Sequence, residues 1–410
     1  LLNSADNNTT LSGYTATNLD FPVWDADSHL YESEEAFLRH LPKKFAKDFQ
    51  FIEINGRKKL AIAGVITDYI PNPDFAVVAS PGAHEKWYRG QNQDGQSMRE
   101  LSGKPLVPPE PWRTGKGKLA ELDGQGIHAS MVFPTLASVV EARLGHKPES
   151  IAALFSSLNS WVEDEWGFAR SERLYPVAMI NLSDVDLAVK ELEVALQRGA
   201  RVVGIRPALV PGPLGGRSPG DREFDPFWAR VNEAGIFVCL HASDSGYDDM
   251  SRRWEGGAKE WIPFEPTPFK ACLDALGRAI SDSLSALICH GVFERFPNVR
   301  VASVENGAHW LPPLLQRLER VYGQMPGYFK QHPVEQFRKH IFVVPFYEDN
   351  IRELAELIPV ERILFGSDYP HPEGLPHPLD YVSEFSILPQ ADVRKVMSGN
   401  LQGLLNGVRD

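Results

Sequence analysis

The chain has 410 residues, of which 43% are hydrophobic and 23% are charged, a composition typical of a globular protein with a substantial core. Its formal charge of −12, without any cluster of basic residues, argues against a nucleic-acid partner, and no apolar run approaches the ~18 residues of a membrane span. The three cysteines lie in apolar segments and the polar N-terminus lacks the pattern of a signal peptide, so we expect no disulfides and a cytoplasmic location.

The first predicted strand already carries a candidate site. We expect residues 1–20 to form a flexible arm and 21–410 a single domain, which opens with a short buried strand at 22–27. Asp27 and His29 lie where this strand ends, and residues two apart in an extended segment point to the same side. A carboxylate oxygen with an imidazole nitrogen is half of a site for a divalent metal such as Zn, Mn or Fe.

A long excursion at 33–118 follows, which does not fit a simple strand-to-helix connection. Within it, Asn55-Gly56 lies between apolar runs at 49–54 and 59–63 and predicts a two-residue hairpin. Several prolines around Trp112 indicate a stiff, irregular loop. The length of this insertion predicts a lid or a partner surface, and a packing insertion without a direct role is the alternative.

Strands and helices alternate from residue 118 onwards. We predict helices at 118–125, 150–171, 185–197, 226–234 and 392–405, and strands at 129–134, 175–180, 201–207, 236–241, 284–290, 299–305, 341–346 and 363–368. Val- and Ile-rich strands separated by amphipathic helices indicate an α/β fold, and their repetition favours a (β/α)₈ TIM barrel with a long insertion after the first strand. With the strand at 22–27 there are nine candidates for eight positions, and we cannot rank 299–305 against 341–346.

Polar residues interrupt these strands at their C-terminal ends, which is the face of a (β/α)₈ barrel that carries the active site. We therefore expect the residues at these ends to converge. They are Asp27 and His29, Arg206, His241, His290, Glu305 and Asp368.

Four stretches of the chain resemble one family. They are Asp25-Ala-Asp-Ser-His29, Cys239-Leu-His241, Ile288-Cys-His-Gly-Val-Phe-Glu-Arg-Phe-Pro297 and Leu364-Phe-Gly-Ser-Asp-Tyr-Pro-His371. They are similar to the amidohydrolase-related barrels of the aminocarboxymuconate-semialdehyde decarboxylase type, as is the closing Met397-Ser-Gly-Asn400 segment. The resemblance spans roughly 20–405, without a recognised motif in the insertion at 33–118.

The resemblance implies a metal held by Asp27, His29, His241 and Asp368. It also implies that His290 is the catalytic acid and base, close to the metal. The family often has His-x-His at the first strand, and an acid in the first place, as here, is a variant found among its hydroxyaryl decarboxylases.

The number of metals depends on the fourth strand and on two further acids. Two-metal members of the broader superfamily often use a carboxylated lysine on that strand. Here the strand contains no lysine and ends in Arg206, which favours one metal per chain. Glu32 and Glu305 leave a second metal open through their carboxylates.

The chemistry of these residue types fits such an enzyme. A metal with an open position can lower the pKa of bound water to about 7, or chelate a substrate carboxylate. An imidazole such as His290 can take and give protons near neutral pH, and Asp368 can accept a proton from water or return one to the product carbon. The planar fork of Arg206 suits a substrate carboxylate.

We therefore expect a metal-dependent hydrolase or non-oxidative decarboxylase of a small carboxylate or aromatic substrate. The motifs do not separate the two reactions, and the long insertion favours hydrolysis. One alternative is a dinuclear Fe or Mn barrel that carries out oxygenation, and another is a non-catalytic subunit of a hetero-oligomer. We expect a homodimer.

Overall fold

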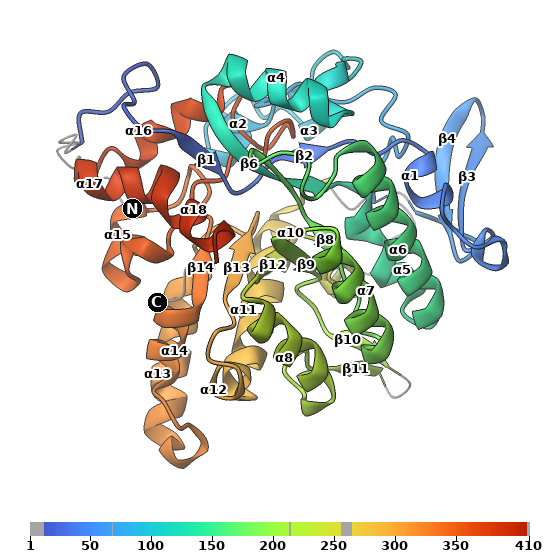
Figure 1. Cartoon of the computed structure of the whole chain (residues 1–410). Helices are drawn as coiled ribbons and strands as arrows, with labels where there is room; N and C mark the ends of the chain where they lie inside the picture. The colour runs from blue at the N-terminus through green and yellow to red at the C-terminus, as the bar shows by residue number, and fades with distance from the viewer. Residues whose placement is uncertain (1–11, 68, 213–214, 256–264, 408–410) are drawn as a thin grey trace.

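A barrel of parallel strands lies at the centre of the computed structural model, which describes residues 12–67, 69–212, 215–255 and 265–407 (Figure 1). Its strands are β1 (Val23–Asp25), β6 (Ile127–Pro134), β7 (Leu174–Pro176) with β8 (Ala178–Met179), β9 (Val202–Ile205), β12 (Phe237–His241), β13 (Val301–Val304) and β14 (Ile341–Val343). Hydrogen-bonded pairs run β1–β6–β7 and β8–β9–β12–β13–β14. The amide of Val177, between β7 and β8, donates to Val132 of β6 at 3.0 Å and joins the two series.

The extended stretch at 363–367 takes the last strand position and closes the ring. The amide of Leu364 donates to the Val343 carbonyl of β14 at 2.9 Å, and the Ala26 amide beside β1 donates to the Phe365 carbonyl at 2.8 Å. The predicted (β/α)₈ barrel is therefore confirmed, and its last strand lies next to its first.

Amphipathic helices follow the strands and cover the outside of the barrel. In α7, for example, the buried residues Ala188, Leu192 and Ala195 recur at helical spacing, and Asp184 caps the first turn by accepting from the Leu187 amide at 3.0 Å. The helices after the insertion are α5 (Val140–Leu144), α6 (Pro148–Glu165), α7 (Val185–Gln197), α8 (Asp225–Ala234), α9 (Tyr247–Trp254), α10 (Pro268–Leu273), α11 (Ala275–Cys289), α12 (Val292–Arg295), α13 (Leu311–Gln324), α14 (Pro333–His340), α15 (Ile351–Leu357), α16 (Val382–Phe385), α17 (Gln390–Arg394) and α18 (Asn400–Leu405). Among the described residues, no helix is both long and apolar enough to cross a membrane.

The insertion at 33–118 contains a small antiparallel sheet and short helices. The sheet consists of β3 (Phe49–Ile54), β4 (Arg57–Ile62) and β5 (Val65–Thr67), and β3 and β4 project from the side of the barrel (Figure 1). Asn55 and Gly56 turn the predicted hairpin with φ of 52° and 72°, as a type I′ turn requires. The helices are α1 (Glu35–Leu38), α2 (Glu85–Tyr88), α3 (Met98–Leu101) and α4 (Gly115–Gln125), which runs past the insertion to β6.

The strand predicted at 284–290 is wrong, because these residues continue helix α11 and its C-terminal cap. The buried residues Ile280, Leu284, Leu287 and Ile288 follow helical spacing, and Asp274 caps the helix by accepting from the Gly277 amide at 3.1 Å. This segment is the surplus strand candidate. Both 299–305 and 341–346, which the sequence could not rank, contribute barrel strands, β13 and β14.

The described part of the N-terminal arm packs against the C-terminal helices. Tyr14 is buried and its hydroxyl donates to Asp20 at 2.8 Å, while the Arg394 guanidinium donates to the same carboxylate. The amide of Ser12 donates to the Ser386 carbonyl at 3.2 Å. Residues 12–20 therefore make defined contacts with the rest of the chain, residues 1–11 lie outside the described part, and the flexibility of the arm stays a prediction.

Buried His340, at the end of α14, makes folding stability depend on pH. Its Nδ1–H donates to the Val299 carbonyl at 2.9 Å, and burial together with the Arg300 charge lowers its pKa to about 4. The unfolded chain therefore binds this proton between about pH 6.5 and 4 and the folded chain does not, so stability falls as the pH drops through that range. We expect a loss on the order of 3 kcal/mol. His340→Gln should flatten the corresponding slope of unfolding free energy against pH in denaturant titrations, and an unchanged slope would contradict this.

Candidate metal centre

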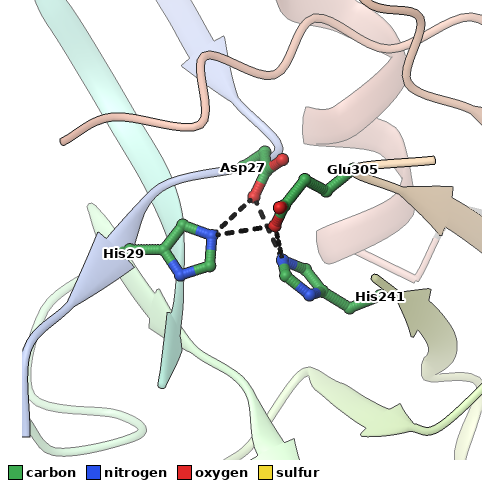
Figure 2. Close-up of side chains that lie close together, drawn as sticks. All are labelled: Asp27, His29, His241 and Glu305. Atoms are coloured by element: carbon green, nitrogen blue, oxygen red, sulfur yellow. Dashed lines mark ion pairs between the residues drawn. The ribbon is translucent and has the colours of Figure 1, made fainter. Parts of the chain in front are cut away.

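Four of the predicted residues meet at the C-terminal ends of the strands. Asp27 follows β1, His29 begins the short β2 (His29–Leu30), His241 ends β12 and Glu305 follows β13 (Figure 2). The His29 Nε2 atom lies 3.5 Å from Asp27 Oδ1 and 3.4 Å from Glu305 Oε2. The His241 Nε2 atom lies 3.5 Å and 3.0 Å from the same two oxygens. Both imidazoles thus face two carboxylates across one small space.

Asp368 joins this cluster from the end of the last strand, and His371 lies beside it. The Asp368 Oδ1 atom is 3.3 Å from His29 Nε2 and 2.8 Å from His371 Nδ1. Asp368 and Glu305 both have left-handed backbones, with φ of 54° and 55°, which is rare for residues other than glycine and common at functional sites.

The atoms that face one another are buried and without hydrogen-bond partners. These atoms are Asp27 Oδ1, His29 Nε2, His241 Nε2 and Asp368 Oδ1. Two atoms that each lie about 2.1 Å from one metal ion are about 3.0 to 3.4 Å apart when they subtend 90° to 109° at it. Three of the five spacings in the cluster fall in this range and the two of 3.5 Å lie just above it, and unpaired buried polar atoms are otherwise costly. The residues therefore fit a single divalent metal.

The electrostatics of the cluster also suit a cation. Burial works against a charged His241, yet Glu305 and Asp27 raise its pKa to about 10. Burial, with the charges of Glu305 and Asp27, raises the pKa of Asp368 well above its ordinary value. The protein therefore concentrates more negative charge here than two imidazoles readily balance.

Asp25 fixes the two strands that carry Asp27 and Asp368. It is fully buried, and its carboxylate accepts from the Asp27 amide at 3.0 Å and from the amide and hydroxyl of Ser367 at 2.9 Å and 2.6 Å. The Asp27 carbonyl in turn accepts from the Asp368 amide at 2.8 Å. A Cβ on Gly366 would lie 2.7 Å from the Asp27 Cβ, so only glycine permits this approach of the strands.

The insertion supplies part of the wall beside the cluster. The His371 ring stacks on that of His29 with centroids 3.8 Å apart, and the Tyr31 ring lies 5.9 Å from the His371 ring. Phe75 stacks on Tyr31 at 4.5 Å, and Trp112 meets the same ring edge-on. Phe75 and Trp112 belong to the insertion, so this segment packs against the residues around the cluster. Whether it moves as a lid stays a prediction.

Solvent reaches the cluster from one side. The Asp27 and His29 side chains are 2% and 1% exposed, whereas Glu305 and His371 are 20% and 14% exposed. The side of the cluster formed by Glu305 and His371 is thus its most exposed side.

Arg206 lines a cavity of about 130 Å³ that opens on the same face of the barrel. Its guanidinium donates to the carbonyls of Asp244 and Leu209 at 3.3 Å and 3.1 Å. Arg143 lies on another wall, where it pairs with the Asp244 carboxylate at 3.1 Å while its Nε has no hydrogen-bond partner. Asp244 follows His241 by three residues, which connects the cavity to the cluster through one short loop.

Two predicted site residues lie elsewhere. His290 is exposed at the end of α11, where its Nδ1 atom is 2.6 Å from the Ser218 hydroxyl, because its segment is a helix and not a barrel strand. Glu32 is buried, but its Oε1 accepts from the Leu136 amide at 2.7 Å, and burial raises its pKa to about 7. Among the described residues, neither belongs to a group that could hold a metal.

Sequence reasoning gave no metal-binding or catalytic role to three residues that the structure places here. It expected His371, three residues after Asp368, only to border the pocket. Thr135 and Asp25 act through contacts with distant segments, and no local pattern marks them.

Comparison with known proteins agrees with this architecture. Residues 84–401 match the amidohydrolase family. The structure superposes with a TM-score of 0.88 on an amidohydrolase from Mycobacterium avium subsp. paratuberculosis K-10, which is 37% identical, over 95% of this chain and 100% of the other. A dihydroxybenzoic acid decarboxylase from Polaromonas sp. JS666, solved with bound manganese and 2-nitroresorcinol, is 17% identical and shares the fold with a TM-score of 0.54 over 80% of this chain and 94% of the other.

A curated relative is also similar. The 2-amino-3-carboxymuconate-6-semialdehyde decarboxylase of Dictyostelium discoideum is 20% identical over 234 residues, which are 55% of this chain. The chain spans 60% of that enzyme's length. The resemblance inferred from the strand-end motifs is confirmed by these matches, and the chain belongs to the amidohydrolase family of enzymes.

Proposed function

We propose that this enzyme uses one divalent metal to act on a small aromatic or related carboxylate, by non-oxidative decarboxylation or by hydrolysis. The observation that carries this proposal is the convergence of ligand atoms from Asp27, His29, His241 and Glu305 within 4.8 Å of one another, with Asp368 Oδ1 3.3 Å from His29 Nε2. When bound, the metal would supply a positive charge that orients and polarises the substrate carboxylate or a neighbouring oxygen.

One metal is favoured over two because the two candidate ligand groups overlap. One group consists of Asp27, His29, His241 and Glu305, and the other of His29, Glu305, Asp368 and His371. Both groups therefore contain His29 and Glu305. The His29 Nε2 atom has a single lone pair, so it can serve only one ion. Zinc, manganese and iron all suit imidazole and carboxylate ligands, and manganese in a related fold supports testing that metal first.

We favour decarboxylation over hydrolysis, although the sequence inclined us to hydrolysis through the long insertion. The insertion packs beside His371 and does not replace any ligand. The curated relative and the manganese-containing structure both carry the name of decarboxylases. In this reaction the carbon–carboxylate bond breaks, its electron pair stays on the substrate carbon, and a proton must reach that carbon.

The pair formed by Asp368 and His371 is placed to deliver that proton. His371 Nδ1 lies 2.8 Å from Asp368 Oδ1, and both side chains face the exposed side of the cluster. We therefore assign to the Asp368–His371 pair the acid–base role that the family resemblance implied for His290. In hydrolysis the same pair would take a proton from the attacking water.

The experiment combines metal analysis with a substrate panel. Protein purified without added metal should contain about one zinc, manganese or iron per chain, and should release CO₂ from dihydroxybenzoates or other small carboxylates. Formation of a carboxylate product from esters or amides, without CO₂ release, would select hydrolysis. Two metals per chain with oxygen consumption would select the dinuclear alternative, and stoichiometric metal without turnover of any substrate would select the non-catalytic one. No metal uptake would refute the proposal.

Arg206 should contribute to substrate binding and not to metal binding. Arg206→Lys removes the planar fork that can hold a carboxylate with two hydrogen bonds, so we expect KM to rise about 10-fold while the metal content stays the same. Arg230→Lys is the matched control, because Arg230 pairs with Glu193 between the outer helices α8 and α7. Equal KM values for the two variants would remove Arg206 from the substrate site.

A further inference from the structure

We propose that Thr135 is a positioning residue whose hydroxyl fixes the ring orientation and the proton position of both His29 and His371. Thr135 follows β6 directly, and its Oγ1 lies 3.4 Å from His29 Nδ1 and 3.2 Å from His371 Nε2. One hydroxyl therefore contacts both a metal-ligand candidate and the imidazole beside Asp368. The part of this proposal that concerns the metal rests on the proposed function, and the part that concerns the two imidazoles does not.

Hydrogen-bond counting gives the direction of these contacts. The Thr135 hydroxyl also lies 3.0 Å from the Leu30 carbonyl, and a carbonyl oxygen can only accept. The single hydroxyl proton is therefore directed at Leu30. The two lone pairs of the same oxygen then face the histidines, so His29 Nδ1 and His371 Nε2 must each carry a proton and donate it.

This arrangement determines which nitrogen of each ring carries no proton and which group that nitrogen faces. With a proton on Nδ1, His29 can offer its Nε2 lone pair to the cluster, as metal ligation requires. With a proton on Nε2, His371 turns the lone pair of its Nδ1 towards Asp368 Oδ1, 2.8 Å away, so in the metal-free protein the proton that this contact requires is carried by the Asp368 carboxyl group. The stacking of the two rings at 3.8 Å keeps both edges against the hydroxyl.

Buried Glu32 in turn holds Thr135 in place. Its Oε1 accepts from the Leu136 amide at 2.7 Å, and the amide of Thr135 also stabilises this carboxylate. Parallel pairing of Leu30 with Pro134 brings the start of this turn next to His29. Glu32, which the sequence suggested as a metal ligand, thus supports the residue that orients one.

The first test uses metal-free protein and so does not depend on the proposed function. Nitrogen-15 NMR of histidine-labelled protein, with a His371→Gln variant to assign the signals, reports which nitrogen of His371 carries the proton. We expect the Nε2–H form in the wild type and in Thr135→Ser. In Thr135→Val, which keeps the shape but loses the acceptor, the Nδ1–H form that donates to Asp368 should appear. Identical His371 signals in wild type and Thr135→Val, or an Nδ1–H wild type, would overturn the proposal.

The second test measures the affinity for zinc alone. Removing a residue that orients a metal-binding histidine typically lowers affinity by about 10- to 100-fold. We expect this loss in Thr135→Val and recovery to within a few-fold of wild type in Thr135→Ser. If Thr135→Val binds zinc as tightly as the wild type, the orienting role towards His29 is refuted while the metal site stands. A wild type that binds no zinc, manganese or cobalt refutes the proposed function, and the NMR test still decides the role of Thr135.

Discussion

Replacing His241 with alanine should lower metal affinity by on the order of 100-fold or more, whereas replacing His290 with alanine should leave it unchanged. His241 Nε2 faces Asp27 and Glu305 at 3.5 Å and 3.0 Å, and its Nδ1 is 2.9 Å from the Ala242 carbonyl, to which it donates, so the Nε2 lone pair is available to a metal. His290 is exposed and hydrogen-bonded to Ser218. Elemental analysis after dialysis, followed by titration of metal-free protein with zinc or manganese, measures the difference.

This pair of variants separates the structural assignment from the sequence motif. The motif assigns His241 to metal binding and His290 to catalysis, so it predicts that both variants lose activity. The structure predicts that His290→Ala keeps its metal and its turnover. Loss of turnover in His290→Ala, with normal folding and full metal content, would show that the end of α11 reaches the site in the working enzyme.

Most of the candidate centre was predictable because its residues follow strands. A buried apolar strand that ends in a charged residue is a local signal, and a barrel gathers such ends on one face. This logic predicted Asp27, His29, His241, Glu305 and Asp368, all of which the structure brings together. The same logic failed at His290, because an apolar run before a polar residue also occurs where a buried helix ends.

The remaining parts of the site depend on contacts between distant segments. The hydroxyl of Thr135 meets His371 across 236 positions of the chain, and Asp25 meets Ser367 across 342. In the sequence, Glu32 resembles a metal ligand because it lies three residues from His29. In the structure, its carboxylate accepts from the backbone amide of Leu136, in the turn that follows β6. No periodicity or spacing reveals such partners, since only the closed barrel places them side by side.

Replacing Asp25 with alanine should destabilise the protein by about 3 kcal/mol and weaken metal binding at the same time. The substitution leaves the buried amide of Asp27 without its acceptor and removes the shorter of the two hydrogen bonds made by the amide and by the hydroxyl of Ser367. Those bonds join the first strand to the last, so their loss frees the backbone that places Asp27 and Asp368. Denaturant unfolding of the metal-free protein measures the first effect, and zinc titration measures the second.

The matched variant Asp25→Asn tests whether the acceptors or the charge of Asp25 matter. Its amide oxygen can still accept from the amides of Asp27 and Ser367, and its NH₂ group can donate to the Ser367 hydroxyl. We therefore expect a change within about 1 kcal/mol and near-normal zinc affinity. A loss in Asp25→Asn as large as in Asp25→Ala would instead mean that the negative charge is required, because the fully buried Lys118, which pairs mainly with Glu121, would lose the additional compensation that Asp25 supplies. Unchanged stability and zinc affinity in Asp25→Ala would show that the remaining backbone bonds, from the Ala26 amide to Phe365 and from the Ser367 and Asp368 amides to the Asp27 carbonyl, are enough to hold the two strands together.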